Sequence, residues 1–236
     1  MRKNHPILTR GRQAALGATL LLAGTGIVQA EFSANIGVTS NYIFRGLTQT
    51  DDGAAVQGGL DYGHESGVYV GAWASNVDFE IEGSNFTGYE LDGWIGFAGA
   101  FEQLNYDLGY IYYAYPGSRD LKDSDFGEIY LNLNVDMLTV GVFYVTNAES
   151  EVREQFKDAV YYYANLDVPI TEDWSAGATL GRQDFRSSAP EDDYTHWQLG
   201  VTRHTDIGDF TFAYDQTDLS GNDGDAKVSA SFVMTF

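Results

Sequence analysis

The chain contains no cysteine, only 4 prolines and few basic residues. Lys and Arg total 13 against 34 Asp and Glu, which gives a formal net charge of −21. Without cysteine the protein forms neither a disulfide nor a thiolate-bound zinc or iron–sulfur site. The shortage of clustered Lys and Arg excludes ordinary binding to nucleic-acid phosphates, and there is no glycine-rich phosphate loop with a Lys. We therefore expect no nucleic-acid partner and no cofactor.

Long apolar runs are also missing beyond the first 30 residues. No later stretch approaches the 18 apolar residues that mark a transmembrane helix, which excludes a helical membrane protein. The chain does contain 27 Gly, 16 Tyr and 14 Phe. A composition rich in glycine and aromatic residues and poor in proline is typical of a closed antiparallel sheet with aromatic belts.

Residues 1–30 have the pattern of a secretory signal peptide. Four basic residues precede an apolar run at 14–28, and small residues at 28 and 30 suit cleavage before Glu31. A retained anchor is the alternative, but the run is shorter than the roughly 20 residues that span a bilayer. We expect a mature domain of 31–236, which would carry a charge of −25 because only basic residues are removed.

The mature sequence alternates apolar and polar residues with a period of two. Twelve such segments of about ten residues can be drawn, which is the length of a tilted bilayer-spanning strand. The first is drawn through 32–45, with Tyr42 and Phe44 on its apolar face. Both faces of 67–77 are apolar, so its orientation stays unassigned. Tyr112, Tyr113 and Tyr115 are interpreted as part of an interfacial aromatic girdle.

The connections between these segments fall into two kinds. Five are short, and they alternate with six that are longer and acidic, including one over 78–88; the short ones are 64–66, 100–103, 136–137, 169–173 and 204–208. This order places both termini at the short-turn end, as in outer-membrane proteins. Alternation alone also occurs in soluble sandwiches. The two signals together predict an all-β fold, a transmembrane antiparallel β-barrel of about twelve strands with short periplasmic turns and longer acidic extracellular loops.

The polar faces supply the candidate site. The apolar faces of the assigned segments carry no charge in their interior, as contact with lipid requires. Twelve strands predict a bore between the filled interior of 8 strands and the open channel of 16 to 18. An acidic lumen would favour cations, although the same acids could instead solvate a plugged interior. The predicted lumen-lining residues are Arg45, Asp61, Glu90, Asp92, Asp107, Glu128, Asp167, His196, Asp215 and Lys227.

One histidine invites a catalytic interpretation. His196 is predicted to face inward near the outer rim, with Ser187, Ser188, Asp192 and Asp193 in the preceding loop. A serine nucleophile beside a histidine base is conceivable there. No motif fixes their spacing, so we interpret His196 as a hydrogen-bonded lumen residue and expect no enzyme, no catalytic residue and no metal site.

Several runs resemble a known family. They are SNYIFRG at 40–46, GGLDY at 58–62, GVYVGAW at 67–73, SNVDF at 75–79, YAYPG at 113–117 and EIY at 128–130. Together they resemble the TorF-type porin family of Gram-negative bacteria, over the whole mature chain and most strongly over 38–131. The resemblance implies an outer-membrane β-barrel, suggests transport and supplies no catalytic residues. By its position, Arg45 would lie at the outer rim of the first strand, where it could meet anions or pair with an acid.

The last nine residues complete the prediction. The segment 228–236 has apolar residues at every second position and ends in Phe236, which looks like the signal read by the outer-membrane barrel assembly machinery. We expect a porin-like channel in the Gram-negative outer membrane, for passive passage of small solutes or ions with a preference for cations. Its expected partners are the membrane lipid, the assembly machinery and the solutes. The alternatives are a non-conducting barrel (a membrane-embedded hydrolase, or a structural or adhesion protein) and a soluble ligand-binding barrel.

Overall fold

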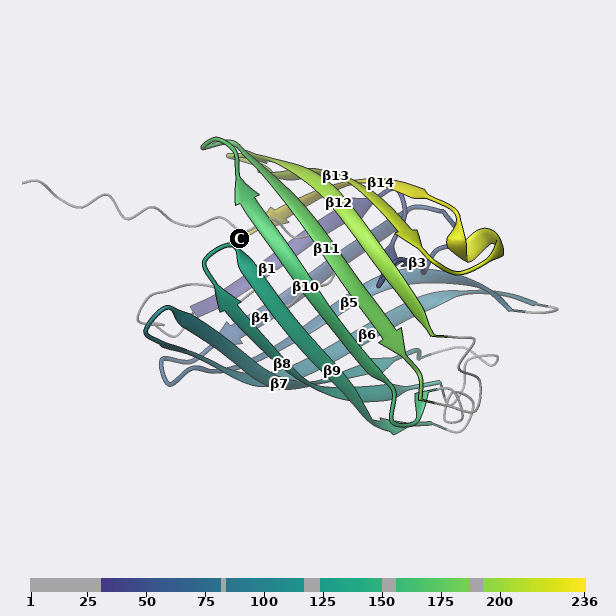
Figure 1. Cartoon of the computed structure of the whole chain (residues 1–236), viewed down its shortest axis with the longest axis horizontal. Helices are drawn as coiled ribbons and strands as arrows, with labels where there is room; N and C mark the ends of the chain where they lie inside the picture. Colours follow the sequence, from purple (N-terminus) through teal and green to yellow (C-terminus); the bar gives the residue numbers. More distant parts are fainter. Residues whose placement is uncertain (1–30, 82–83, 117–123, 150–155, 187–192) are drawn as a thin grey trace, which may run out of the picture.

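In the computed structural model, which describes residues 31–81, 84–116, 124–149, 156–186 and 193–236, the chain forms a closed antiparallel barrel (Figure 1). Each barrel strand pairs with its neighbours in sequence, and β1 and β14 close the ring, with Ile36 opposite Met234. The twelve strands are β1 (Glu31–Thr39), β4 (Ala55–Gly63), β5 (Val68–Ile81), β6 (Ser84–Phe101), β7 (Leu104–Ala114), β8 (Phe126–Val135), β9 (Leu138–Ala148), β10 (Val160–Pro169), β11 (Trp174–Asp184), β12 (Tyr194–Thr205), β13 (Gly208–Thr217) and β14 (Lys227–Thr235). The predicted fold is confirmed. Among the helices in the described ranges, none has the length and hydropathy to cross a bilayer.

Closure explains how this chain can lie in lipid. Every strand of the ring has a partner on both sides, so no sheet edge leaves backbone N–H and C=O groups unpaired in hydrocarbon. Large apolar side chains cover the outer surface: Phe32 is 64% and Val228 70% exposed. Packing against a second protein layer would have buried them. An apolar band of this extent is what a membrane, rather than water, accommodates.

The structure shows which face of β5 points outward, which the sequence alone does not predict. On β5, Val68 and Val70 are exposed on the outer surface, and Tyr69 between them is buried inside the barrel. Val70 lies opposite Ile95 of β6 in the register, and Ile95 is exposed as well. Both faces read as apolar because the inward positions carry Tyr69 and Trp73.

Short and long connections lie at opposite ends of the barrel, as expected. In Figure 1 the short turns lie at the same end as the C-terminus, on the left of the view. One long connection differs from the prediction. The predicted loop over 78–88 is not a loop, because β5 and β6 stay paired as far as Ile81 and Ser84 and extend past the rim as a hairpin. The acidic residues suggested a loop, but the period-two pairing continues through them.

The first predicted strand is wrong beyond Thr39. Residues 40–54 leave the wall and form the inward hairpin, whose two short strands are β2 (Ile43–Phe44) and β3 (Leu47–Thr48). Its turn is Arg45–Gly46, with φ of 50° and 87°. Positive φ at both central residues is the type I′ geometry of two-residue hairpins. Consequently Tyr42, which was predicted to face lipid, is only 3% exposed, and Phe44 packs against Tyr113 inside the barrel.

Glycines and aromatic rings pair across neighbouring strands on the inner face. Tyr69 lies opposite Gly96, and a Cβ built on that glycine would come within 2.3 Å of the ring. Trp94 covers Gly71, and Tyr130 covers Gly109, in the same manner. The rings fill space that the missing side chains leave, which stabilises the sheet. This pairing accounts for the joint abundance of Gly and Tyr, and it narrows the bore.

Candidate functional site: the barrel interior

The structure places the predicted lumen residues as follows. Seven of them are buried on the inner side of the strands: Glu90, Asp92, Asp107, Glu128, His196, Asp215 and Lys227. Asp61 and Asp167 also alternate inward, on β4 and β10, and are partly exposed. Arg45 is in the interior for a different reason, because the inward hairpin carries it there. Its predicted place at the outer rim of the first strand is wrong.

Arg45 crosses the bore to reach the far wall. In the ring order, β8, β9, β10 and β11 lie opposite β1 and β4, which flank the hairpin. Arg45 donates two hydrogen bonds to Glu128 on β8, Nη1 to Oε1 at 3.0 Å and Nη2 to Oε2 at 2.7 Å. Nη1 also donates to Gln183 Oε1 on β11 at 3.1 Å. The hairpin therefore spans the interior from one wall to the other.

Aromatic rings enclose the Arg45 guanidinium. Its Cζ atom lies 4.1 Å from the ring centroid of Tyr161 and 5.1 Å from that of Phe143, which are distances of cation–π contact. Burial lowers the pKa of Arg45, but the Glu128 carboxylate outweighs burial and holds the pKa above its ordinary value. The guanidinium thus stays charged, and the ion pair is neutral as a unit.

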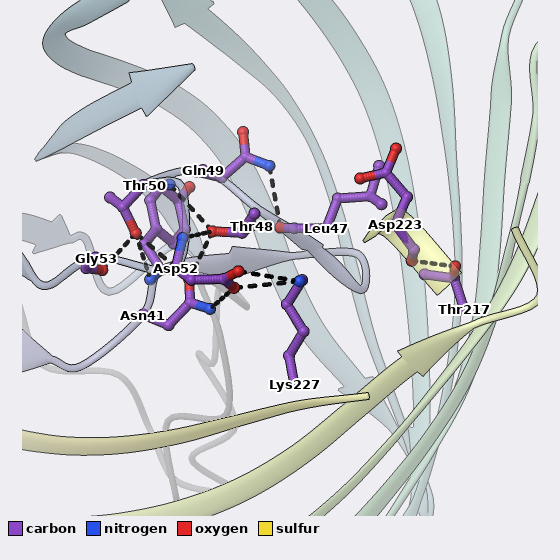
Figure 2. A network of polar contacts seen from close by, with 11 residues as sticks. Asn41, Leu47, Thr48, Gln49, Thr50, Asp52, Gly53, Thr217, Asp223 and Lys227 are labelled. Atoms are coloured by element: carbon purple, nitrogen blue, oxygen red, sulfur yellow. Dashed lines mark hydrogen bonds and ion pairs between the residues drawn. The ribbon is translucent and has the colours of Figure 1, made fainter. Parts of the chain in front are cut away.

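A second set of polar contacts fixes the base of the hairpin (Figure 2). Asn41 Nδ2 donates to Asp52 Oδ1 at 2.8 Å, and Thr48 Oγ1 donates to Asn41 Oδ1 at 2.7 Å. Lys227, at the start of β14, points from the wall toward Asp52, and its Nζ lies 3.2 Å from the carboxylate. Lys227 therefore balances an acid of the hairpin rather than the open lumen.

Tyr113 and Tyr115, predicted to lie in an interfacial girdle, instead face the interior. Tyr113 OH donates to Glu128 Oε2 at 3.1 Å, and Tyr115 OH donates to Glu90 Oε1 at 3.4 Å. Tyr112 is only partly buried, and its hydroxyl donates to Asp125 at 3.2 Å. Two of the three tyrosines are thus hydroxyl donors to buried carboxylates.

A further cluster lies nearer the short-turn end. Tyr69 OH donates to Asp107 Oδ1 and lies 2.5 Å from Tyr130 OH. Tyr163 OH donates to Asn132 Oδ1 at 3.0 Å, and Asn132 donates to the other Asp107 oxygen at 3.4 Å. Sequence reasoning missed Tyr69, because it lies in the segment whose faces could not be assigned.

Several buried carboxylate oxygens accept no hydrogen bond from the described residues. In the described ranges, Glu90 Oε2, Asp92 Oδ1 and Asp215 Oδ2 are buried without a hydrogen-bond partner. Such groups are costly unless water or a cation satisfies them. Groups of three or more His, Asp or Glu arranged to hold a metal are absent from the same ranges. These three acids therefore leave hydrogen-bonding capacity in the interior that water or a cation could satisfy.

His196 has the surroundings of a structural residue. Its Nε2 lies 2.9 Å from Tyr161 OH, and its Nδ1 has no hydrogen-bond partner within the described part of the chain. Asp193 accepts from the backbone N–H of Phe185 and pairs with Arg182. Ser187, Ser188 and Asp192 lie outside the described residues. No acid in the described ranges orients His196 as a base.

The sequence matches one family model, described as a bacterial protein of unknown function (Gcw_chp), over residues 24–232. The chain belongs to the Gcw_chp family. No curated protein matches it. The TorF-type resemblance remains a prediction beside this family assignment.

Solved structures similar to this Gcw_chp protein are barrels of comparable size. The KdgM porin aligns with a TM-score of 0.56 at 9% identity, covering 86% of this chain and 98% of that one. LpxR from Salmonella typhimurium aligns with a TM-score of 0.50 at 11% identity, covering 86% and 99%. An outer membrane phospholipase A from Escherichia coli aligns with a TM-score of 0.49 at 13% identity, covering 86% and 91%. At 9% and 11% identity, the likeness to the KdgM porin and to LpxR concerns the fold, which is that of outer-membrane barrels.

Proposed function

We propose that this Gcw_chp protein is a porin-like channel of the Gram-negative outer membrane that passes small solutes or ions passively and favours cations. One observation carries the proposal. Both cationic residues of the predicted lumen set are paired with acids, Arg45 with Glu128 and Lys227 with Asp52. Within the part of the chain that the structure describes, Glu90, Asp92 and Asp215 each keep a buried oxygen without a partner. The same set holds seven acids against these two cations, and an acidic lining attracts cations into the bore.

The narrowness of the interior sets the size of the solute. The inward hairpin crosses the bore. Aromatic rings such as Tyr69 and Tyr130 project from the wall nearer the short-turn end. Small ions or solutes suit such a passage. The KdgM porin is also known in complex with disordered oligogalacturonate. That solute carries carboxylates, so the acidic interior here favours a different cargo.

The proposed setting follows from the two ends of the chain. Residues 1–30 would direct export and be removed, and the segment 228–236 ending in Phe236 would be recognised by the barrel assembly machinery. The outward apolar band would contact the membrane lipid. The TorF-type resemblance supports the same assignment.

Planar-bilayer recording tests the proposal. The mature chain, refolded and added to a bilayer, is expected to give discrete current steps, and a KCl gradient is expected to give a reversal potential of the sign set by K⁺. Preparations that are folded by circular dichroism yet never give current steps would contradict a channel and favour the non-conducting structural or adhesion protein. Steps with anion preference would contradict the acidic-interior argument alone.

A further inference from the structure

Three polar side chains on neighbouring strands form a chain of hydrogen bonds at the short-turn end of the barrel. Ser175 Oγ on β11 lies 3.1 Å from His204 Nε2 on β12. His204 Nδ1 lies 3.0 Å from Asp209 Oδ1 on β13. Each residue is the second from an end of its strand, and each alternates to the inner side, opposite to Trp174, Arg203 and Phe210.

The connectivity assigns a role to each atom. A carboxylate can only accept, so the Asp209 contact places the imidazole proton on Nδ1. The lone pair of Nε2 then faces the Ser175 hydroxyl, which donates to it. His204 is fixed further by its backbone N–H, which donates to the carbonyl of Asp173 at 2.8 Å. Nucleophile, base and orienting acid thus follow one another in the order that activates a serine for acyl transfer.

A hydroxyl that can act as the donor for a developing oxyanion lies next to the serine. Thr202 is directly opposite Ser175 in the β11–β12 register, so its side chain lies beside Ser175 on the inner face. Its Oγ1 is 2.9 Å from Thr211 Oγ1. When Thr202 Oγ1 accepts this hydrogen bond, its own hydroxyl hydrogen can be directed at a substrate oxygen bound beside Ser175 and stabilise negative charge there.

We propose that Ser175, His204 and Asp209 form a catalytic site that hydrolyses carboxylic esters of soluble solutes entering from the short-turn side. Ser175 Oγ would attack the ester carbonyl while His204 Nε2 takes its proton. The tetrahedral intermediate would then expel the alcohol, which receives that proton, and leave an acyl group on Ser175. Water, deprotonated by His204, would attack the acyl group and release the carboxylic acid, returning the proton to Ser175.

The position of the site selects the class of ester. The three side chains face the interior, and Ser175 and His204 are each 8% exposed, whereas the neighbouring Trp174 and Phe210 face the outer surface. Acyl chains of bilayer phospholipids lie on the other side of the wall. The sequence alone predicts that the chain is not an enzyme, and a catalytic Ser175 would contradict that prediction. The three residues lie outside the predicted lumen set, so a test of their activity does not depend on whether the barrel conducts.

A covalent probe provides the test. The folded full barrel in detergent micelles is treated with a fluorophosphonate, and mass spectrometry is expected to place the label on Ser175. Ser175→Ala should abolish the label, and His204→Ala should slow labelling by about a hundredfold or more, because it removes the general base. Thr179→Ala is the matched control, since it removes an inward hydroxyl four residues along β11 that donates to Asn165. Its labelling rate should equal that of the unmodified protein.

Hydrolysis provides the second readout. The protein should cleave p-nitrophenyl acetate, lose this activity in Ser175→Ala, and leave phospholipid vesicles intact. An unlabelled Ser175 in the unmodified folded barrel would overturn the proposal, even if every variant failed to fold. Equal labelling rates for the unmodified protein and a folded His204→Ala would overturn it as well. Cleavage of the vesicles rather than of the soluble ester would overturn the assigned substrate class.

Discussion

Arg45 and Glu128 are 83 residues apart in the sequence, and their side chains meet at 2.7 Å inside the barrel. One lies at the turn of the inward hairpin and the other on the far wall, so their ion pair holds the hairpin across the bore. Removing one member of such a buried pair leaves the other charge uncompensated.

Arg45→Ala should widen the passage and weaken the fold. The hairpin loses its contacts to Glu128 and Gln183, and the buried Glu128 carboxylate loses its counter-charge. We expect a larger single-channel conductance and a free energy of unfolding lower by about 3–5 kcal/mol in urea titration. Arg186→Ala is the control, since that side chain is 59% exposed beside Asp184 and should change both quantities little. Unchanged conductance in Arg45→Ala would show that the hairpin does not limit the current.

Gly46→Ala tests the same constriction without altering any charge. The φ of Gly46 is 87°, and a Cβ there would lie 2.6 Å from His196 Cβ and 2.9 Å from Thr217 Cγ2. The turn must move, so conductance should rise as it does in Arg45→Ala. Gly221→Ala is a close control, because its φ of 73° imposes similar backbone strain with nothing within 4 Å of the added atom. Both variants should lose about 1–2 kcal/mol to strain, and only Gly46→Ala should alter the current.

The selectivity of the channel should depend on the unsatisfied acids. In the double variant Glu90→Gln and Asp92→Asn, two buried acidic side chains are replaced by amides of nearly the same size, which cannot ionise. We expect the K⁺ over Cl⁻ preference to fall, measured as a smaller reversal potential in a KCl gradient. Glu65→Gln, in an exposed short turn, is the control and should leave the reversal potential almost unchanged. An unaltered preference in the double variant would move the source of selectivity elsewhere.

Tyr69→Phe should lower stability without changing shape. The hydroxyl donates to Asp107 and contacts Tyr130 OH, and its loss leaves a buried carboxylate oxygen without a donor. The free energy of unfolding should decrease by about 1–3 kcal/mol. Tyr62→Phe, on the outward face of β4 and 43% exposed, should change it by less than about 0.5 kcal/mol. Equal effects of the two variants would argue against the Asp107 cluster as a stabilising unit.

The sequence predicts the barrel because lipid imposes one rule on every strand. Outward residues such as Phe32 and Val228 must be apolar at every second position, and the turns must alternate in length. The same rule misleads at Tyr42 and Phe44, where alternation continues although the chain has left the wall. The only local signal is Gly46, since glycine readily adopts the positive φ that a two-residue hairpin turn requires.

Residues that meet through strand register are harder to predict. Arg45 with Glu128, and Ser175 with His204 and Asp209, come from segments that carry no shared local motif. Their contacts depend on how the ring closes and on which residues lie opposite one another. Alternation assigns each residue to the inner or outer face, but it does not specify its height in the barrel or its neighbour across the bore.

The matched placement of rings and glycines on the inner wall has one more consequence. Tyr69 occupies the space above Gly96, and Tyr130 the space above Gly109. A larger side chain at either position of such a pair would clash with the other residue, whereas exchanging the two residues across the strands keeps their total side-chain volume. These positions should therefore covary among relatives, and paired replacements should offer a way to reshape the conduit without unravelling its wall.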